Sequence, residues 1–302
     1  MRVEPFGTKD LREVRRLHAD VFGRVRLDSF LWQPCQQVES LELEGPKYVA
    51  RGGAGVSGYA AAYPLDATHF RLNLIVAPSR TGWGVGTRLL SELEAEVRRR
   101  GGLYLQARLL EGAGSGLAFA LARGFEEIHR MRGMSLRAGD FRHDRWQPLG
   151  RRLSEEGFSL TTLKAETEAG RGPVDKLVEL HARAQEGWPS PDPTWHTDDA
   201  GRRRSLFTDV ARPELFSIMK LGERYAGYTS AKRQNLTATA VDPDFRGRGV
   251  ATYMKAHNLA LCIAAGEDYF ETCSASPAMI RVNEKLGYRP NGLVEVRLLK
   301  RL

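Results

Sequence analysis

The segment VDPDFRGRGVA, residues 241–251, decides how we interpret the fold of this chain. It follows a β-like run, LTATAV (236–241), and leads into a helix-like run, ATYMKAHNLALCIAA (251–265). A glycine-rich turn between a strand and a helix directs several unpaired backbone N–H groups outward, at the positive end of the helix dipole. The segment therefore predicts a binding site for phosphate groups.

Two residue types in this turn favour that interpretation. Gly247 and Gly249 allow a ligand to approach the backbone closely, and Arg246 and Arg248 supply positive charge. The turn contains neither the dinucleotide fingerprint G-x-G-x-x-G nor the loop G-x-x-x-x-G-K-[ST], which disfavours hydrolysis of ATP or GTP. The alternative is an ordinary strand-to-helix turn with solvated arginines.

The chain repeats itself. VAPSRTGWGVGTRLL (76–90) matches VDPDFRGRGVATYMK (241–255), 165 positions further on. Later in each copy, GlyPhe at 124–125 matches GlyTyr at 287–288, now 163 positions apart. A period near half of the 302 residues indicates two similar domains and not a solenoid, whose units are far shorter.

We predict an N-terminal domain at 1–142 and a C-terminal domain at 143–302. The polar segment FRHDRWQPLGRRLSEEG (141–157) is expected to be a linker that merges into a short helix. In the C-terminal half we expect a strand at 158–166, and the proline-rich WPSPDPTW (188–195) to be a loop, either beside an acceptor pocket or as a simple connection between helices.

The turn also resembles the pyrophosphate-binding loop of the GNAT superfamily, the acetyl-CoA-dependent N-acyltransferases. That family's pattern, Gln/Arg-x-x-Gly-x-Gly/Ala, corresponds to RGRGVA at 246–251. SPAMIRVNEKLGYRP (276–290) is similar to the closing helix and strand start of GNAT domains. The resemblance implies an α/β (α+β) fold of two tandem GNAT-like domains, each a mixed, largely antiparallel twisted sheet flanked by helices. The tandem layout is similar to that of mycothiol synthase, although no residue specifies that substrate.

The resemblance implies acetyl-CoA as the acyl donor and suggests which residues bind it. In the C-terminal half these are the strand backbone, the loop and one residue after the next strand: Ala240, Val241, Arg246, Gly247, Arg248, Gly249, Val250, Ala251 and Ser276. In the N-terminal half they are Val76, Gly82, Gly84 and Gly86. Thr81 stands at the arginine position of that second loop.

Many GNAT members carry a tyrosine that acts as the general acid on the departing thiolate. The corresponding positions here are Ala120 and Asn283. Alanine cannot hydrogen-bond, whereas asparagine can, although it does not release a proton as a phenol does. We therefore expect a competent site in the C-terminal half, and an N-terminal half that is a degenerate scaffold or a weaker CoA site.

Glu271 is our candidate general base for the amine. Strand alternation places Tyr269, Glu271 and Cys273 on one face of the strand at 269–273. The alternative role of Glu271 is that of a surface or edge-strand carboxylate.

Composition limits the other possibilities. With 42% hydrophobic residues the chain can form cores in two domains, and it contains no apolar run of the roughly 18 residues that a membrane span requires. Three sparse cysteines without metal-ligand spacing favour a reduced cytoplasm and no bound metal.

We expect transfer of an acetyl group to a primary amine of a small molecule, by a monomer or homodimer that binds no nucleic acid and no membrane. A non-catalytic acyl-CoA-binding sensor or scaffold is the alternative, because the tyrosine is missing. The net charge of +8 alone suggests a nucleic-acid-binding protein, but the short basic runs are not interleaved with aromatic residues.

Overall fold

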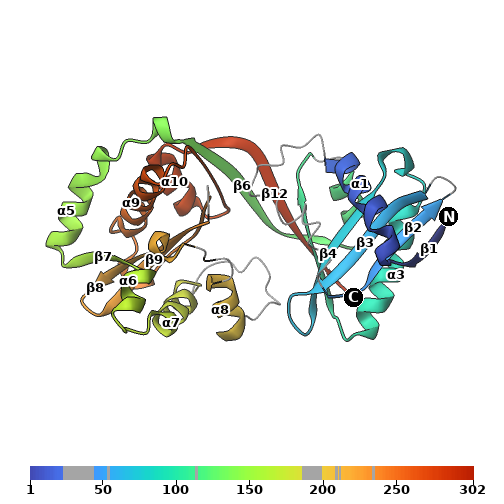
Figure 1. Cartoon of the computed structure of the whole chain (residues 1–302), viewed down its shortest axis with the longest axis horizontal. Coiled ribbons are helices and arrows are strands. Elements are labelled where there is room, and N and C mark those ends of the chain that lie inside the picture. Colours follow the sequence, from blue (N-terminus) through green and yellow to red (C-terminus); the bar gives the residue numbers. More distant parts are fainter. Residues whose placement is uncertain are drawn as a thin grey trace. The chain divides into compact units, whose positions relative to one another are not determined.

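The computed structural model describes residues 1–22, 44–52, 55–112, 115–185, 199–207, 210, 212–232 and 235–302 (Figure 1). The chain divides into two compact units. The N-terminal unit comprises Met1–Met131 with Val294–Leu302, and the C-terminal unit comprises Arg132–Leu293. The boundary expected between residues 142 and 143 lies inside the C-terminal unit.

In the N-terminal unit the sheet order is β1-β2-β3-β4-β5-β12. Its strands are β1 (Arg2–Pro5), β2 (Lys47–Gly52), β3 (Gly55–Pro64), β4 (His69–Val76), β5 (Tyr104–Leu110) and the end of β12 (Arg289–Arg301). The β4–β5 pair is parallel and the other neighbours are antiparallel. Its helices are α1 (Leu11–Phe22), α3 (Val85–Arg99) and α4 (Gly116–Leu121).

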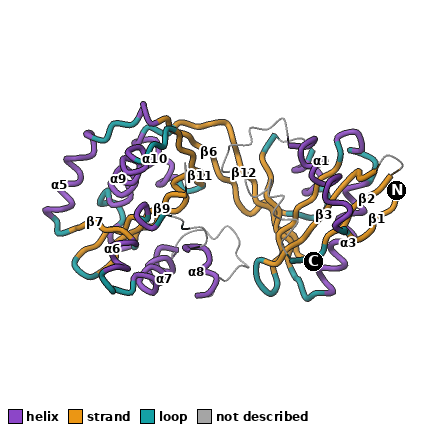
Figure 2. Tube along the Cα trace, viewed as in Figure 1, coloured by secondary structure: helices purple, strands orange, loops and turns teal. Residues whose placement is uncertain are grey.

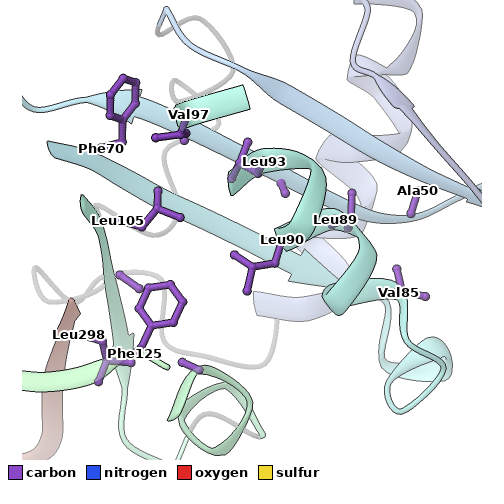
Figure 3. Close-up of a cluster of buried hydrophobic side chains, with 14 of the residues drawn as sticks. Ala50, Phe70, Val85, Leu89, Leu90, Leu93, Val97, Leu105, Phe125 and Leu298 are labelled. Carbon is purple, nitrogen blue, oxygen red and sulfur yellow. The ribbon is translucent and has the colours of Figure 1, made fainter. Parts of the chain in front are cut away.

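Strand alternation supplies both faces of this sheet with apolar side chains. On β3, Tyr59 and Ala61 pack in one cluster with Val14 and Leu17 of α1. The intervening alanines of β3 face a second cluster that contains the buried leucines of α3, shown in Figure 3. The unit is therefore a sheet covered by helices on both faces.

The C-terminal unit repeats this plan with sheet order β7-β8-β9-β10-β11-β6. Figure 2 colours its strands orange and its helices purple. Its strands are β7 (Phe158–Thr162), β8 (Ser217–Leu221), β9 (Arg224–Lys232), β10 (Asn235–Val241), β11 (Tyr269–Ser274) and the end of β6 (Glu126–Arg137). The β10–β11 pair is parallel, and the other neighbours are antiparallel. Its helices are α5 (Gln147–Glu155), α6 (Leu163–Glu168), α7 (Pro173–Gln185), α8 (Asp199–Phe207), α9 (Val250–Ala264) and α10 (Pro277–Leu286).

Adjacent residues of β8 again face opposite sides. Ile218 belongs to the cluster of α7, with Leu177 and Tyr228, whereas Met219 belongs to the cluster of α9, with Met254. The two units therefore share one architecture, as the internal repeat predicts. Among the described residues, no helix is both long and apolar enough to cross a membrane.

The last strand of each half completes the sheet of the other unit. Residues Glu295–Arg301 of β12 pair with β5, and residues Arg132–Arg137 of β6 pair with β11. Each strand satisfies backbone groups that would otherwise form an open sheet edge. Because of this exchange of strands, the two units do not divide at the single boundary expected between residues 142 and 143.

One expected strand is shorter than predicted. The segment expected as a strand at 158–166 is β7 up to Thr162 and then helix α6, because the Thr162 hydroxyl accepts a hydrogen bond from the Ala165 amide at 3.1 Å. This N-cap starts the helix. The linker region contains α5, as expected, and the proline-rich loop at 188–195 lies outside the described residues.

Candidate functional site

Both units carry the same loop between a strand and a helix. Each strand is followed by a short 3-10 helix, Pro243–Phe245 in the C-terminal unit and Pro78–Arg80 in the N-terminal unit. Two glycines with left-handed backbone follow in each loop, and their φ angles are +79° and +91° at Gly247 and Gly249, and +83° and +76° at Gly82 and Gly84. Glycine is the residue that adopts this conformation without strain.

The loop of the C-terminal unit presents a run of unpaired backbone amides. Within the described residues, the N–H groups from Gly247 to Thr252 donate no hydrogen bond, and the next amide, that of Tyr253, donates to the Gly249 carbonyl at 3.0 Å. Arg246, Gly247 and Arg248 are exposed, Gly249 and Ala251 are half-buried, and Val250 is buried as the first residue of α9. The exposed part of this run can hold an anion such as a diphosphate.

Asp242, at the end of β10, sets the direction of the loop. Its carboxylate accepts hydrogen bonds from the Asp244 amide at 3.0 Å, from Arg183 Nε at 2.9 Å and from Arg224 Nη2 at 2.9 Å. Burial raises the pKa of Asp242, but these three donors outweigh burial and bring the pKa to about 2. Asp242 therefore shapes the turn that leads into the loop.

The two loop arginines are held by the protein itself. Arg246 Nη2 donates to the Ala184 carbonyl at 2.8 Å. Arg248 Nη2 lies 3.6 Å from Glu156 Oε2, and the Arg248 carbonyl accepts a hydrogen bond from Arg152 of α5 at 2.7 Å. Both side chains stay at the loop, so their charge is still available to a bound anion.

Of the expected N-terminal site residues, Gly82 and Gly84 lie in the exposed loop and a Cβ at either would meet no neighbouring atom within 4 Å. Gly86 is different, because it is buried and a Cβ there would lie 3.0 Å from the Phe119 ring. Val76 ends β4 and packs against the core cluster. Gly86 therefore serves close helix packing within the unit.

The parallel strands of the C-terminal unit separate early. β10 pairs with β11 at Asn235 and Glu271, and a bulge interrupts the β9–β10 register between Leu236 and Ala238. Ala240 and Val241 lie beyond this point, half-buried and paired with β9. In the N-terminal unit the equivalent pairing continues through four residues, from His69 to Leu72 of β4, without a register shift between β3 and β4.

Glu271 is 7% exposed and lies where the two strands begin to separate. The Tyr269 hydroxyl donates a hydrogen bond to Glu271 Oε1 at 3.1 Å, so both side chains lie on one face, as strand alternation predicts. The carboxylate is therefore inside the unit and not on an exposed edge.

Ser276 and Asn283 hold different positions on α10. The Ser276 hydroxyl caps the helix by accepting from the Met279 amide at 3.4 Å. Asn283 is fully buried, and neither atom of its side-chain amide has a hydrogen-bond partner among the described residues. An unpaired buried amide costs about 1–3 kcal/mol, so a ligand that pairs with Asn283 would recover that energy.

Two further buried polar residues of the C-terminal unit escaped the sequence analysis. Lys255 of α9 is 1% exposed and Tyr288, next to β12, is 0% exposed. The internal repeat contained the signal, because it aligns Lys255 with Leu90 and Tyr288 with Phe125. A lysine at a buried apolar helix position is the kind of departure that marks a site. Within the described ranges, no group of three His, Cys, Asp or Glu side chains is arranged to hold a metal.

Comparisons with known proteins bear on the fold and the family. The family model described as acetyltransferase (GNAT) family matches residues 11–125, which lie in the N-terminal unit. A search of curated proteins found no match.

Three solved structures share the fold across 99% of this chain. A GCN5-related N-acetyltransferase from Sphaerobacter thermophilus is 15% identical over 95% of its own length, with a TM-score of 0.72. A GCN5-related glucosamine N-acetyltransferase region of a fungal multi-domain β-N-acetylglucosaminidase is 16% identical over 38% of that chain, with a TM-score of 0.72. A tandem GNAT protein from the clavulanic acid biosynthesis pathway is 19% identical over 98% of its length, with a TM-score of 0.66. Residues 11–125 therefore match the GNAT acetyltransferase family, and the whole chain has the fold of these tandem GNAT structures.

Proposed function

We propose that the C-terminal unit is an N-acetyltransferase that moves the acetyl group of acetyl-CoA to a primary amine of a small molecule. The observation that carries the proposal is the presence, in one unit, of a loop with unpaired amides from Gly247 to Thr252 and of the buried, unpartnered amide of Asn283. The first feature suits the diphosphate of CoA, and the second suits a polar group buried deeper in the unit.

The remaining geometry fits an extended thioester. A ligand held by the loop can continue along β10, where the backbone at Ala240 and Val241 lies beyond the last pair with β11. Backbone amides in such a gap can polarise the thioester carbonyl and stabilise the oxyanion that forms on it. Holding the amine and the thioester next to each other contributes a further large part of the rate enhancement.

In the proposed reaction the amine nitrogen attacks the thioester carbon directly. Glu271 is the base that accepts the proton of the amine, either directly or through a water molecule. Asn283 donates a hydrogen bond from its amide nitrogen toward the thioester sulfur.

For the N-terminal unit we propose the role of a scaffold or weaker CoA site. Its loop has the same glycine geometry, but Ala120 stands where the C-terminal unit has Asn283. A non-catalytic acyl-CoA sensor is the second candidate for the whole chain, favoured by the absence of a phenol at position 283.

The test compares Gly247→Asp with Gly82→Asp. Both glycines have a left-handed backbone and open space around them, so the two substitutions carry the same local cost and the same charge. Aspartate tolerates this backbone conformation and repels a diphosphate. We expect Gly247→Asp to weaken acetyl-CoA binding in calorimetry by at least about 100-fold and to abolish thiol release with a panel of amines.

Gly82→Asp should change the rate of thiol release by no more than about twofold. Equal loss of activity in both variants would contradict the assignment of catalysis to the C-terminal unit. Binding of acetyl-CoA without thiol release from any amine would instead favour the sensor.

A further inference from the structure

Three arginines gather on one face of the sheet in the N-terminal unit. Arg71 of β4 pairs with Gln106 of β5, and Arg108, two residues further along β5, pairs with Arg297 of β12. Their neighbours along the strands belong to the core cluster of α3, part of which Figure 3 shows: Phe70, Leu105, Ala107 and Val296. Strand alternation therefore turns the arginines to the face opposite α3. We call Arg71, Arg108 and Arg297 the arginine cluster.

Arg71 is the buried member of the arginine cluster, and its bonding is incomplete. It is 6% exposed, and its Nη2 donates a hydrogen bond to Oε1 of Gln106. The Nε atom is buried and has no hydrogen-bond partner among the described residues. A buried guanidinium N–H without an acceptor is unfavourable, so a ligand that accepts from Arg71 Nε would recover free energy on binding.

The carboxylate nearest to the arginine cluster is bound to its outer members. Glu295 Oε1 lies 2.7 Å from Arg297 Nε and 3.8 Å from Arg108 Nε, and among the described residues no carboxylate forms an ion pair with Arg71. Burial, with smaller contributions from Arg108 and Arg297, lowers the pKa of Arg71 to about 9, which is still above neutral pH. Arg71 is therefore a buried cation whose charge is not matched by a direct ion pair, which is an unfavourable arrangement in the free protein.

The C-terminal unit shows that the fold does not require these charges. The offset of 165 positions places Gln106 at the position of Glu271, the proposed base, and both residues belong to the parallel pairs of their sheets. In the C-terminal unit the positions equivalent to the arginine cluster carry no positive charge: Asn235, Cys273 and Gly133. The same place in the sheet therefore has a carboxylate and no arginine in one unit, and an amide with three arginines in the other.

A ligand can reach the arginine cluster from solvent. The parallel pairing of β4 with β5 ends at Leu72 and Ala107, so Arg108 lies just beyond the point where these two strands stop pairing. The side chains of Arg108 and Arg297 are 22% and 18% exposed, whereas Arg71 lies deeper. An anionic group can therefore enter past the two outer arginines and meet Arg71 Nε at the inner end.

We propose that the arginine cluster binds the carboxylate or phosphate group of a small molecule, and that the N-terminal unit is a binding module for this anion. Guanidinium groups suit both kinds of anion, because their planar N–H donors match the spacing of carboxylate and phosphate oxygens. Gln106 cannot accept a proton as the carboxylate of Glu271 does, so binding at this site does not lead to transfer. The site lies within the N-terminal unit, and the inference does not depend on catalysis in the C-terminal unit.

The experiment measures anion binding to the full chain by calorimetry and thermal unfolding. Succinate supplies carboxylates, inorganic phosphate supplies the other anion, and sodium chloride at equal ionic strength measures general screening. We expect wild type to bind succinate or phosphate at least about tenfold more tightly than chloride, and Arg71→Met to lose at least about tenfold of that affinity. Free Arg71→Met should unfold at the same temperature as free wild type or higher, because the substitution removes a buried cation that has no ion-pair partner among the described residues. A purely structural arginine would instead lower the unfolding temperature when removed.

Matched variants locate the bound anion. Arg15→Met removes the same charge from an exposed position of α1 and should bind both anions as wild type does. Gly247→Asp and Gly82→Asp place negative charge in the two glycine loops and should leave succinate binding unchanged, because the arginine cluster is separate from both loops. Arg108→Met should weaken binding at least about tenfold, as Arg71→Met does.

The preference of wild type for succinate or for phosphate identifies the group that the arginine cluster recognises. Wild type that binds neither anion more tightly than chloride would overturn the proposal, and so would equal binding by wild type and Arg71→Met. The first of these comparisons uses wild type alone, so it decides the matter even if Arg71→Met does not fold. Failure to bind acetyl-CoA would refute the proposed function without affecting this site.

Discussion

Arg152 of α5 donates a hydrogen bond of 2.7 Å from Nη2 to the backbone carbonyl of Arg248. A second contact supports the same edge of the loop, because a Cβ at Gly249 would lie 2.9 Å from Leu149 Cδ1, also of α5. Helix α5 therefore holds the carbonyl side of the loop from within the protein. The amides from Gly247 to Thr252 remain unpaired.

Removing the Arg152 side chain should loosen the loop. We expect Arg152→Ala to weaken acetyl-CoA binding about three- to tenfold, because a charge-assisted hydrogen bond contributes about 1 kcal/mol here and the loop must be ordered again on binding. Isothermal calorimetry measures the change. Arg151→Ala removes the adjacent, exposed arginine of the same helix and should leave the affinity unchanged. An equal loss of acetyl-CoA affinity in both variants would mean that the positive charge of α5, and not the ordering of the loop, determines binding.

Gly84 and Gly249, the second glycine of each loop, should differ in how well they tolerate substitution by a residue with a side chain. Both need a left-handed backbone, but a Cβ at Gly249 meets Leu149, whereas a Cβ at Gly84 meets no atom within 4 Å. We expect Gly84→Ala to cost about 1 kcal/mol from backbone strain, and Gly249→Ala to cost about 2–3 kcal/mol because steric overlap adds to strain. Chemical denaturation measures both. Adding Leu149→Ala should recover the steric part, and no recovery would show that the overlap is unimportant.

Asn283 should lower the stability of the free protein while it supports catalysis. Replacing it with leucine removes two unpaired buried polar atoms while keeping the number of side-chain heavy atoms. We expect Asn283→Leu to raise the free energy of unfolding of the free protein by about 1–2 kcal/mol and to lower kcat at least about tenfold. Saturating CoA should then stabilise wild type more than the variant. A less stable Asn283→Leu protein would indicate that the amide is already satisfied in the fold.

Asp242 should govern the acid stability of the C-terminal unit. Its folded-state pKa of about 2 lies below the ordinary value of 3.8, so the ionised carboxylate stabilises the fold at pH values above about 3.8. That stabilisation is lost as the pH falls toward 2. We expect Asp242→Asn to cost about 1–3 kcal/mol at pH 7, with a difference from wild type that shrinks as the pH falls from 4 to 2.

Asp244→Asn is the control for the acid-stability measurement. Asp244 shares Arg183 and Arg224 with Asp242 but is 54% exposed, so its loss should cost less than about 0.5 kcal/mol. Unfolding followed by circular dichroism at several pH values checks both variants. A difference between wild type and Asp242→Asn that does not depend on pH would contradict the linkage.

The local sequence determined the loops, the repeat and most elements. The turn needs a left-handed backbone at 247 and 249, and glycine is the residue that adopts it without strain, so a short-range pattern is sufficient to locate the turn. The comparison of Ala120 with Asn283 was also visible in the sequence, because the spacing to the following Gly-aromatic pair is the same in both halves. The end of the strand at Thr162 was missed, because a hydroxyl that caps a helix looks like any other β-branched residue in a strand pattern.

Tertiary structure alone decided which side chains meet. Pairing of β12 with β5 and of β6 with β11 joins segments that are far apart in the chain, and no local pattern records such a choice of partner strand. Likewise, whether Lys255 is a solvated helix residue or a buried cation beside Tyr288 depends on how α9 packs. Backbone conformation follows from neighbouring residues, whereas burial and the energetic cost of an unpaired group follow from contacts that exist only in the folded chain.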